Sequence, residues 1–550
     1  MADTYTLNHP VLGPLTGKIL SGNVVQFSGV PYATIPARFK RSIMLEKLPG
    51  NSTDYTTPGF ACPHKYDGDD IYGGGAIPGE PSEYPMDEFK CLILQIHVPL
   101  ALLQSKSKSK LPILFYIHGG GFKEGKIDLV HSTHLQIAQS ITDSKPVIGV
   151  SIQYRLGALG FMTTPEEKSS NLGMWDQRNA LIWVQKFIGG FGGDEKKITA
   201  FGESAGSMSI SLHMLSDPPK SGPLFQRAIL QSGVLGLMSS PKSATAAKTQ
   251  YQNVLKLLGI TGSEEEALKK LREVGMPELL QASETVVSGA AGLWGVAQDS
   301  EWFGEKRGIV DWTNMAKLLG ECDWVKEVII GDTGFEGQAY YSVIKDYTPA
   351  LLLGAISQQI GASAAASIAK IYNISTGMDL NKFYSIGMLW YGDVVFDAPT
   401  HDLAKHLSTS SKMKVYRYIF DVGNPFPGSK MYQQSHHWVD VYFMFKTFEF
   451  RFAKERLKDI STQHARMWTG FANGKAPWKE YKYADGKDAI IFVADQQEGW
   501  VKRTVGEDEK LNERSWDRCE ALYQAWGQTG PAKRDLTIAD MKPSQQQEIV

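Results

Sequence analysis

Short runs of apolar, mostly β-branched residues alternate along the chain with longer stretches whose apolar residues recur every three or four positions. The apolar runs lie at residues 113–118, 147–154, 198–201, 228–230, 328–330 and 415–420. Runs of this kind predict buried β-strands, and most of the stretches between them predict helices. Strands that alternate with helices over this length predict an α/β fold, in which helices cover both faces of a mostly parallel central sheet.

The pattern becomes almost wholly helical in two stretches, at about residues 236–319 and 340–406. The first contains KTQYQNVLKLLG and EEEALKKLREV, whose apolar residues follow helical spacing. We interpret both stretches as helical insertions that form a cap on a single domain spanning residues 1–550. The polar composition of residues 531–550 predicts a flexible tail.

Composition and charge narrow the class of protein. A chain of 550 residues with 42% hydrophobic and 21% charged residues is typical of a globular protein with a large core. Its 57 basic and 59 acidic residues give a formal net charge of −2 without long runs of one sign, which argues against nucleic-acid binding. We therefore expect a small-molecule partner.

The apolar runs also bear on membranes and localisation. No stretch reaches the roughly 18 apolar residues of a membrane span, and the first residues lack the basic and apolar regions of a signal peptide. These features predict a soluble, cytoplasmic protein, or a secreted one if a leader preceded this sequence. They predict nothing about the oligomeric state.

The segment GGDEKKITAFGESAG, residues 192–206, joins a short apolar strand to an apolar helix through G-E-S-A-G. A serine at the centre of G-x-S-x-G occupies a tight strand-to-helix turn that only flanking glycines permit, and its hydroxyl projects toward a ligand. The helix that follows, from Ala205, points its first amides at the same spot and favours a developing negative charge. The segment predicts Ser204 as a nucleophile.

A second glycine-rich segment, IHGGGF at residues 117–122, follows the strand at residues 113–118. The oxyanion formed during acyl transfer needs amide donors, and backbone amides are most accessible where no side chain intervenes. Gly120 and Gly121 can supply two donors and Ala205 a third. The rival interpretation, a phosphate-binding loop, lacks the lysine and Ser/Thr of a P-loop.

A serine hydroxyl becomes a good nucleophile when a base takes its proton, and the usual order along such chains is serine, acid, histidine. VIIGDTGFEG, a strand followed by a turn, offers Asp332 and Glu336 as the acid. The histidines further along are His401, His406, His436, His437 and His464. These features alone choose neither between the acids nor among the histidines.

Several longer segments occur in an order that resembles the type-B carboxylesterase/lipase family, which includes the cholinesterases and many fungal esterases and lipases. They are VVQFSGVPYATIP, YIHGGGF, SIQYRLGALGF, FGGDEKKITAFGESAG, LFQRAILQSG and GDVVFDAP, and the resemblance spans nearly the whole chain. The serine signature departs from the family at Ala200, where a branched apolar residue is usual. The resemblance implies an α/β-hydrolase fold and a carboxylic-ester hydrolase that needs no cofactor.

The resemblance also implies which acid and which histidine act. The family's acid lies in a G-x-x-x-x-E-G turn, matched by residues 331–337, which implies Glu336. Its histidine lies in H-x-x-[ED]-x-x-x-x-F, matched by HWVDVYFMF, which implies His437. Trp438 stands where the family usually has glycine.

Supporting residues follow from the same resemblance. Glu203 corresponds to a buried acid that influences the electrostatics of the site, and Ser232 to a serine near the acid and the histidine. Cys62 and Cys91 correspond to a pair that often forms a disulfide in the family. The cysteines show neither CxxC nor zinc spacing, so the sequence predicts no metal site.

Aromatic residues are frequent in the predicted cap and rim, where an apolar acyl or alcohol group could pack. We take Trp294, Tyr340 and Trp390 as candidate pocket residues. Taken together, these features predict a serine carboxylesterase that hydrolyses an ester of a small or apolar substrate through an acyl-enzyme. Two alternatives stay open: an acyltransferase or specialised-metabolism enzyme acting on a lactone or natural-product ester with the same triad, and a non-catalytic binding protein on this fold.

Overall fold

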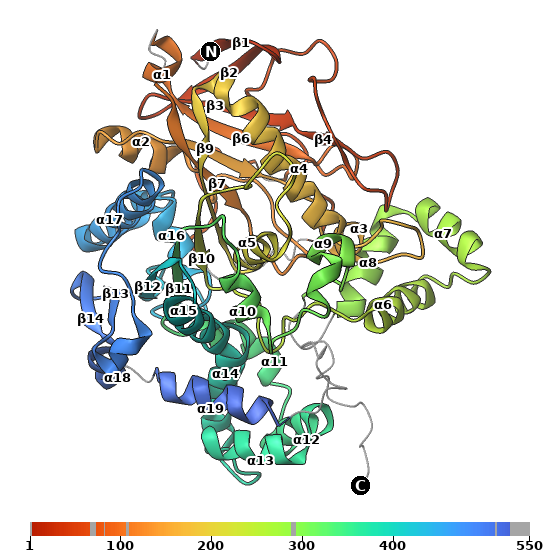
Figure 1. Ribbon diagram of the computed structural model, residues 1–550, viewed down its shortest axis with the longest axis vertical. Helices are drawn as coiled ribbons and strands as arrows, with labels where there is room; N and C mark the ends of the chain where they lie inside the picture. Colours follow the sequence, from red (N-terminus) through yellow and green to blue (C-terminus); the bar gives the residue numbers. More distant parts are fainter. Residues whose placement is uncertain are drawn as a thin grey trace.

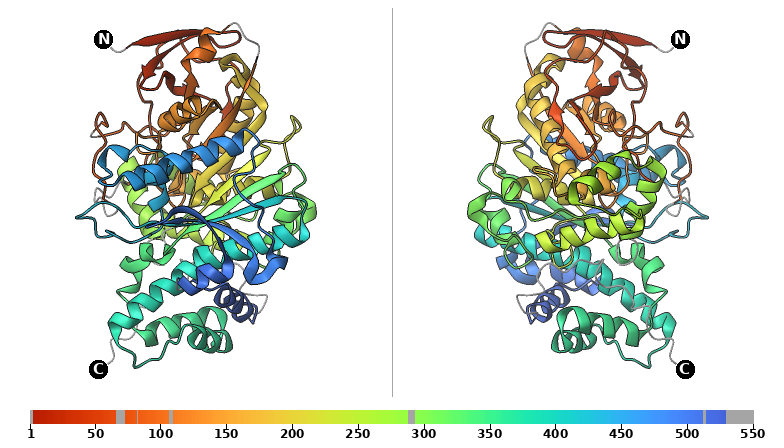
Figure 2. Two further views of the ribbon diagram at one scale, coloured as in Figure 1. Left: turned by 90° about the vertical axis from the view of Figure 1, so that its left-hand side faces the viewer. Right: turned by 90° about the vertical axis from the view of Figure 1, so that its right-hand side faces the viewer.

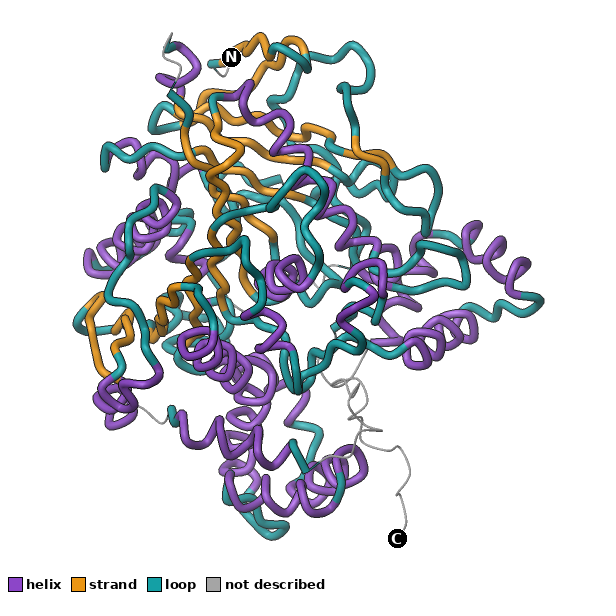
Figure 3. The backbone as a smooth tube through the Cα atoms, viewed as in Figure 1, coloured by secondary structure: helices purple, strands orange, loops and turns teal. Residues whose placement is uncertain are grey.

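A central β-sheet with helices on both faces forms the body of the protein (Figure 1, Figure 3). The computed structural model describes residues 3–65, 73–81, 83–105, 109–287, 293–511 and 514–528. The predicted tail at residues 531–550 lies outside the described residues. No helix in these ranges is both long enough and apolar enough to cross a membrane.

The main sheet is mixed but mostly parallel in its centre, as predicted. Its strands, in order across the sheet, are β1 (Thr4–His9), β2 (Gly13–Leu20), β3 (Val24–Pro31), β6 (Ile93–Pro99), β8 (Ile148–Ile152), β7 (Leu111–Ile117), β9 (Gly193–Glu203), β10 (Arg227–Gln231), β11 (Glu327–Thr333), β12 (Lys414–Asp421), β13 (Ile490–Asp495) and β14 (Gly499–Thr504). Strands β8 to β13 pair in parallel, and the strands at the two ends of the sheet pair antiparallel. A small second sheet joins β4 (Ala33–Thr34) to β5 (Ile43–Met44).

The register of the parallel strands sets the place of the functional site. Ile117 of β7 lies opposite Gly202 of β9, Glu203 opposite Gln231 of β10, and Gln231 opposite Gly331 of β11. The carboxyl ends of these strands therefore meet at one edge of the sheet, the position where open α/β sheets bind ligands. The loops that follow them carry the predicted site residues.

Both faces of the central strands are buried, and alternate residues of each strand point to opposite faces. In β7, Phe115 and Ile117 belong to the apolar cluster under α4 (Leu172–Phe187), α5 (Ala205–Leu215) and α15 (Ala398–Ser410). Leu114 and Tyr116 belong to the cluster under α2 (His134–Thr142) and α17 (Glu455–Ala472). The left-hand panel of Figure 2 shows α17 in front of the sheet.

Helices occupy both predicted insertions. The first contains α6 (Ala244–Leu257), α7 (Glu264–Glu273), α8 (Met276–Val287), α9 (Ser300–Phe303), η2 (Glu305–Arg307) and α10 (Met315–Gly320). The second contains α11 (Tyr341–Ile344), α12 (Pro349–Ile360), α13 (Ala362–Ile371), α14 (Leu380–Gly392), the π-helical turn η4 (Asp393–Asp397) and most of α15. In Figure 1, α6 and α7 project at the right and α12 and α13 lie at the bottom, beside the C-terminal helix α19 (Trp516–Trp526).

The remaining helices are short and lie between strands. They are α1 (Leu100–Gln104), α3 (Gly157–Phe161), η1 (Ile188–Phe191), η3 (Glu336–Tyr340), α16 (Val439–Met444), η5 (Glu449–Arg451), η6 (Tyr483–Asp488) and α18 (Val505–Leu511).

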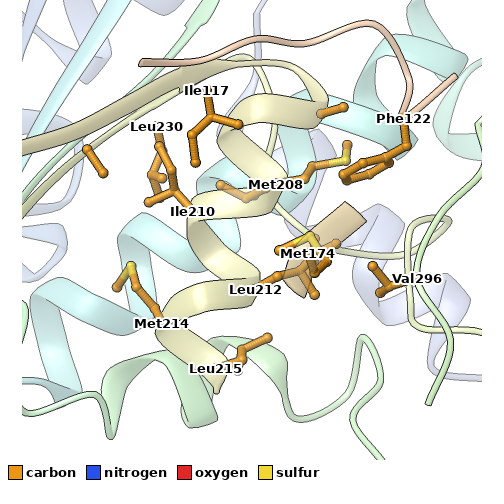
Figure 4. Close-up of a cluster of buried hydrophobic side chains, with 14 of the residues drawn as sticks. Ile117, Phe122, Met174, Met208, Ile210, Leu212, Met214, Leu215, Leu230 and Val296 are labelled. Carbon is orange, nitrogen blue, oxygen red and sulfur yellow. The ribbon is translucent and has the colours of Figure 1, made fainter. Parts of the chain in front are cut away.

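Helix α5 is buried along its whole length, and its sequence combines apolar residues with serines whose hydroxyls bond to backbone carbonyls. Its Met208 and Leu212 pack with Met174 of α4 (Figure 4). Phe122, from the loop after β7, inserts its ring into the same cluster and is 2% exposed. The core thus anchors both the helix that follows Ser204 and the loop that faces it.

Candidate active site

Ser204 lies at the turn between β9 and α5 in a strained backbone conformation. Its φ of 55° and ψ of −125° are values that residues with a side chain rarely adopt. A Cβ added to Gly202 would lie 2.7 Å from the carbonyl oxygen of Ile117, and one added to Gly206 would overlap the same oxygen. The close approach of the turn to β7 therefore requires the glycines of G-E-S-A-G, and the turn presents Ser204 at the edge of the sheet.

The loop after β7 is held by a buried histidine and glutamine. Gln153 Oε1 accepts from the amide of Ile127 (3.1 Å), while its Nε2 donates to Gly125 O (3.2 Å) and to Nε2 of His118 (3.2 Å). Because His118 Nε2 accepts, its proton is on Nδ1, which donates to Gly119 O at 2.9 Å. Burial lowers the pKa of His118 to about 3, so the ring stays neutral.

These contacts fix the direction in which two amides point. In a planar trans peptide the N–H points away from the carbonyl oxygen. The Gly119 carbonyl faces His118, and the Gly120 carbonyl accepts from the amides of Lys123 and Glu124, both at 3.0 Å. The amides of Gly120 and Gly121 are thereby turned away from those partners. Within the described residues, neither these amides nor that of Ala205 donates to another protein group, which leaves three donors for an oxyanion.

Glu336 faces His437 at the end of β11. One carboxylate oxygen accepts from the amide of Thr333 (2.6 Å), and the other lies 2.6 Å from His437 Nδ1. Burial alone would raise the pKa of Glu336, but the charge and hydrogen bond of His437 outweigh it and lower that pKa. The Ser232 hydroxyl contributes in the same direction. Asp332, the other acid considered, pairs instead with Arg417 at 2.6 Å.

His437 lies in the loop between β12 and α16. A bridge between Phe335 and His436, in which the Phe335 amide donates to Ser435 O at 2.8 Å, joins this loop to the one that carries Glu336. The imidazole of His437 stacks on Phe396 of η4, with ring centroids 4.3 Å apart. The other candidate histidines have other hydrogen-bond or ring partners or lie elsewhere: His401 with Glu520, His436 with Asn424, His464 with Trp468, and His406 near Gly320.

A second acid, Glu203, lies at the other nitrogen of the imidazole. His437 Nε2 lies 3.1 Å from Glu203 Oε1. Burial would lower the pKa of His437, but the charges of Glu203 and Glu336, with a contribution from Asp440, raise it to about 9. Burial also raises the pKa of Glu203 to about 8 and that of Asp440 to about 6. The site thus stabilises an imidazolium, the charged form that a general base acquires during the reaction.

Ser204 and His437, each 8% exposed, line one cavity of about 360 Å³. We call it the Ser204 cavity; its lining includes Gly120, Gly121, Glu203, Tyr340, Phe396 and Trp438. No hydrogen bond joins Ser204 to His437 in the part of the chain that the structure describes. Such contacts are often long without substrate and tighten when it binds.

The structure corrects two of the three pocket predictions. Tyr340 lines the Ser204 cavity, but Trp294 and Trp390 are fully buried and do not line it. Trp294 acts through its backbone, whose amide donates to Gly121 O at 3.0 Å, and Trp390 packs edge-on against Tyr391. The frequency of aromatic residues in the cap and rim does not show which rings face the cavity and which face the core.

The two cysteines that the resemblance marks as a possible disulfide are not bonded to each other in this structure. Cys62 and Cys91 are buried and adjacent, and both are free thiols. The sulfur of Cys62 accepts instead from the amide of Leu156 at 3.3 Å. Among the described residues, no group of His, Cys, Asp or Glu side chains is arranged to hold a metal ion.

Several residues of the site had no assigned role from the sequence. His118 lies in IHGGGF, and Asp440 is the acid of the histidine motif. Gln153 and Phe396 lie in segments that resemble the family, but no pattern in those segments assigned them a contact, because tertiary packing brings them to the site. Trp438 had been noted only as a departure from glycine.

Comparisons with known proteins show what the chain is similar to. The profile of the carboxylesterase family matches residues 4–511. Lipase 3 of Yarrowia lipolytica is 27% identical over 545 residues, covering 97% of this chain and 98% of that protein. A mouse (Mus musculus) cholinesterase is 33% identical over 341 residues, 59% of this chain and 52% of that protein. A solved PNB esterase structure superposes with a TM-score of 0.74 at 25% identity, covering 94% of this chain and 99% of its own.

Proposed function

Since the chain belongs to the carboxylesterase family and is a carboxylic-ester hydrolase, we propose that it cleaves its ester through Ser204, His437 and Glu336 by way of an acyl-enzyme. The observation that carries this proposal is the 2.6 Å contact between Glu336 and His437 Nδ1 at the rim of the cavity that holds Ser204. With Glu336 at Nδ1, the nitrogen that exchanges the proton is Nε2, which lies 3.1 Å from Glu203 Oε1.

In the first half of the reaction, His437 Nε2 takes the proton of Ser204 Oγ while that oxygen attacks the ester carbonyl carbon. The amides of Gly120, Gly121 and Ala205 bind the resulting oxyanion. When the tetrahedral intermediate collapses, the bond to the alcohol oxygen breaks and His437 gives its proton to that oxygen. The alcohol leaves, and the acyl group stays on Ser204.

In the second half, His437 takes a proton from water, whose oxygen attacks the acyl carbon. The second oxyanion binds to the same amides, and its collapse releases the carboxylic acid and returns the proton to Ser204. Glu336 stays ionised throughout, holds the proton of His437 on Nδ1 and stabilises the imidazolium. The low pKa of its carboxyl supports this role.

The cavity supports a small ester as substrate. A volume of about 360 Å³ lies near the lower end of the range typical of small-molecule pockets. Its wall combines the rings of Tyr340, Phe396 and Trp438 with the polar groups of the oxyanion loop. We propose an apolar or aromatic ester of modest size.

The test compares wild type with Ser204→Ala on p-nitrophenyl esters of increasing acyl length, with organophosphate labelling followed by intact mass. We expect labelling to disappear and turnover to fall by about 10⁴- to 10⁶-fold. Ser211→Ala is the matched control, because Ser211 is a buried serine of the same helix whose hydroxyl donates to Ser207 O. Normal labelling of Ser204→Ala, or a folded wild type that is neither labelled nor active, would refute the proposal.

A further inference from the structure

Trp438, directly after His437, adopts a backbone conformation that suits glycine and is unusual for a bulky residue. Its φ is 76° and its ψ is −6°, in the left-handed region. A large side chain persists there only where its surroundings hold it or where a function keeps it. Because glycine would satisfy the backbone without strain, the conformation itself gives no reason for an indole at this position.

The contacts of the indole show where it lies. The ring is half-buried and packs edge-on against His131, at 5.6 Å between centroids, and against Tyr442, at 5.0 Å. His131 is hydrogen-bonded to Asp128 (2.7 Å), and the Tyr442 hydroxyl donates to Gly73 O (3.0 Å). The indole is thus held by two anchored rings, and it also lines the Ser204 cavity.

The chemistry of the proposed reaction indicates which part of an ester this wall would meet. The carbonyl oxygen of the substrate lies at the amides of Gly120, Gly121 and Ala205. The alcohol oxygen must lie within hydrogen-bond distance of His437, which gives it a proton as it leaves. The alcohol portion therefore lies on the imidazole side of Ser204. Trp438 follows His437 in the chain, and both residues line the cavity that holds Ser204.

We propose that Trp438 is a specificity-determining residue whose indole forms the wall against the alcohol portion of the ester and excludes bulky alcohols. This inference rests on the proposed function. A cavity restricted in this way favours esters of compact or single-ring alcohols over esters of fused-ring alcohols, and it places no comparable limit on the acyl group.

The experiment uses the full-length protein and two ester series that share one member. Phenyl acetate and 1-naphthyl acetate differ in the alcohol, whereas phenyl acetate and phenyl benzoate differ in the acyl group. In Trp438→Gly and Trp438→Ala, we expect the ratio of kcat/KM for 1-naphthyl over phenyl acetate to rise about tenfold or more. The ratio for benzoate over acetate should change by less than about twofold, and Trp438→Phe should be intermediate in the alcohol series.

Trp478→Ala is the matched control. Trp478 is also a half-buried tryptophan packed among aromatic rings, at 5.1 Å from Phe492, but it does not line the Ser204 cavity. This variant should lose thermal stability and keep both ratios. A purely structural role for Trp438 would give the same pattern in its own variants, so stability loss with unchanged ratios would overturn the inference.

The remaining outcomes are also decisive. A larger change in the acyl series than in the alcohol series would overturn the inference, because it would put the indole beside the acyl group. If the Gly and Ala variants do not fold, Trp438→Phe together with the inhibition constants of phenol and 1-naphthol provides the same comparison. Titration of Ser204 with an organophosphate separates the proposed function from the proposed role of Trp438. If wild type is labelled and active, but the kcat/KM ratios of the Trp438 variants equal those of wild type, only the role of Trp438 is refuted.

Discussion

The two halves of the site are held by different forces. On the nucleophile side, the turn at Ser204 and the loop after β7 are set by backbone contacts so close that glycine is required at Gly202 and Gly206. On the acid–base side, Glu336 and His437 are held by buried charges and by a bridge between two loops. The first half therefore tolerates no added atoms, while the second is sensitive to changes of charge that preserve shape.

The strongest test of this difference removes one charge without changing size. Glu336→Gln should lower kcat by about 10⁴-fold, because an amide in place of the carboxylate no longer holds the proton of His437 on Nδ1 or stabilises the imidazolium. The measurement is kcat corrected for folded enzyme by active-site titration. The melting temperature should change little by comparison.

Asp332→Asn is the matched control, because Asp332 is a second buried acid at the end of the same strand. It leaves Arg417 with an unbalanced buried charge, so we expect a loss of about 3–5 kcal/mol in stability. The kcat per folded molecule should stay within about threefold, because its partner is not His437. A loss of turnover in Asp332→Asn larger than in Glu336→Gln would reverse the assignment of the acid.

The nucleophile side is tested by adding one methyl group. In Gly206→Ala the new Cβ meets the carbonyl of Ile117 and pushes α5 away from β7. We expect a loss of about 1–3 kcal/mol in stability, typical of overpacking. The kcat should fall by about 100-fold, since a misplacement of about 1 Å at a reacting group has that effect.

Gly470→Ala is the control for that variant. Gly470 lies in α17, where an added Cβ meets nothing within 4 Å. This variant should gain up to about 1 kcal/mol from helix propensity and keep its activity. If both glycine variants behaved alike, the close contact at Ile117 would not be the reason for glycine in the turn.

The same difference explains what the sequence alone could predict. The strand, the glycine turn, Ser204 and the first residues of the helix lie within fifteen consecutive residues, 192–206, so local rules describe them together. The alternation of strands and helices predicted the α/β sheet, which the structure confirms. Glu336 and His437 are 101 residues apart, and five histidines were candidates. Only the resemblance to a family selected Glu336 among the acids and His437 among the histidines, because the contact between these two residues depends on tertiary structure.

The pocket shows where such reasoning ends. Trp294 and Trp390 were candidates for the pocket because aromatic residues are frequent in the cap and rim, and both are core residues. Composition does not show which neighbour a ring faces. Trp438 and Phe396 line the cavity from segments that carried no pocket signal. The side chain of Gln153 donates hydrogen bonds to His118 and to Gly125 O in the oxyanion loop, and no sequence pattern describes these contacts.

We expect a smaller loss of activity when His118, the histidine bonded to the oxyanion loop, is replaced. Asn has its amide nitrogen on Cγ, like Nδ1 of histidine, and can donate to Gly119 O, whereas the nitrogen of Gln lies one bond further out. His118→Asn should therefore retain more activity than His118→Gln. Both losses should stay below the roughly 100- to 1,000-fold cost of removing an oxyanion donor.

The readout for the His118 variants is kcat together with KM. Because the oxyanion forms only after substrate has bound, the loss should appear in kcat, with KM within about threefold of wild type. Equal activity of the two variants would mean that the hydrogen bond to Gly119 does not orient the loop. A loss confined to KM would point to a substrate contact instead.

The smallest expected change is a shift of the pH profile in a variant of Glu203. Glu203 precedes Ser204 in the nucleophile turn, but its charge acts on His437 of the acid–base side. Its carboxylate lies 3.1 Å from His437 Nε2 and is the largest of the charges that raise the pKa of His437. His437 must be neutral to act as a base, so the acid limb of kcat/KM against pH follows its pKa in the free enzyme. In Glu203→Gln that charge is gone while the shape remains. The pKa of His437 should fall, and the acid limb should move to lower pH by about 1–3 units.

In wild type, burial raises the pKa of Glu203 to about 8, close to the pKa of about 9 of His437. The two groups therefore titrate as a pair, and the acid limb of the kcat/KM profile reports the pair and not a single residue. In Glu203→Gln the limb should become a single ionisation. Profiles of kcat/KM between pH 5 and 10, with Glu195→Gln at an exposed surface pair as the control, measure both effects. An acid limb that stays at the same pH in Glu203→Gln would show that Glu203 acts on the site through packing alone. Glu203 would then belong with the nucleophile side, which is held by shape, and His437 with the acid–base side, which is held by charge.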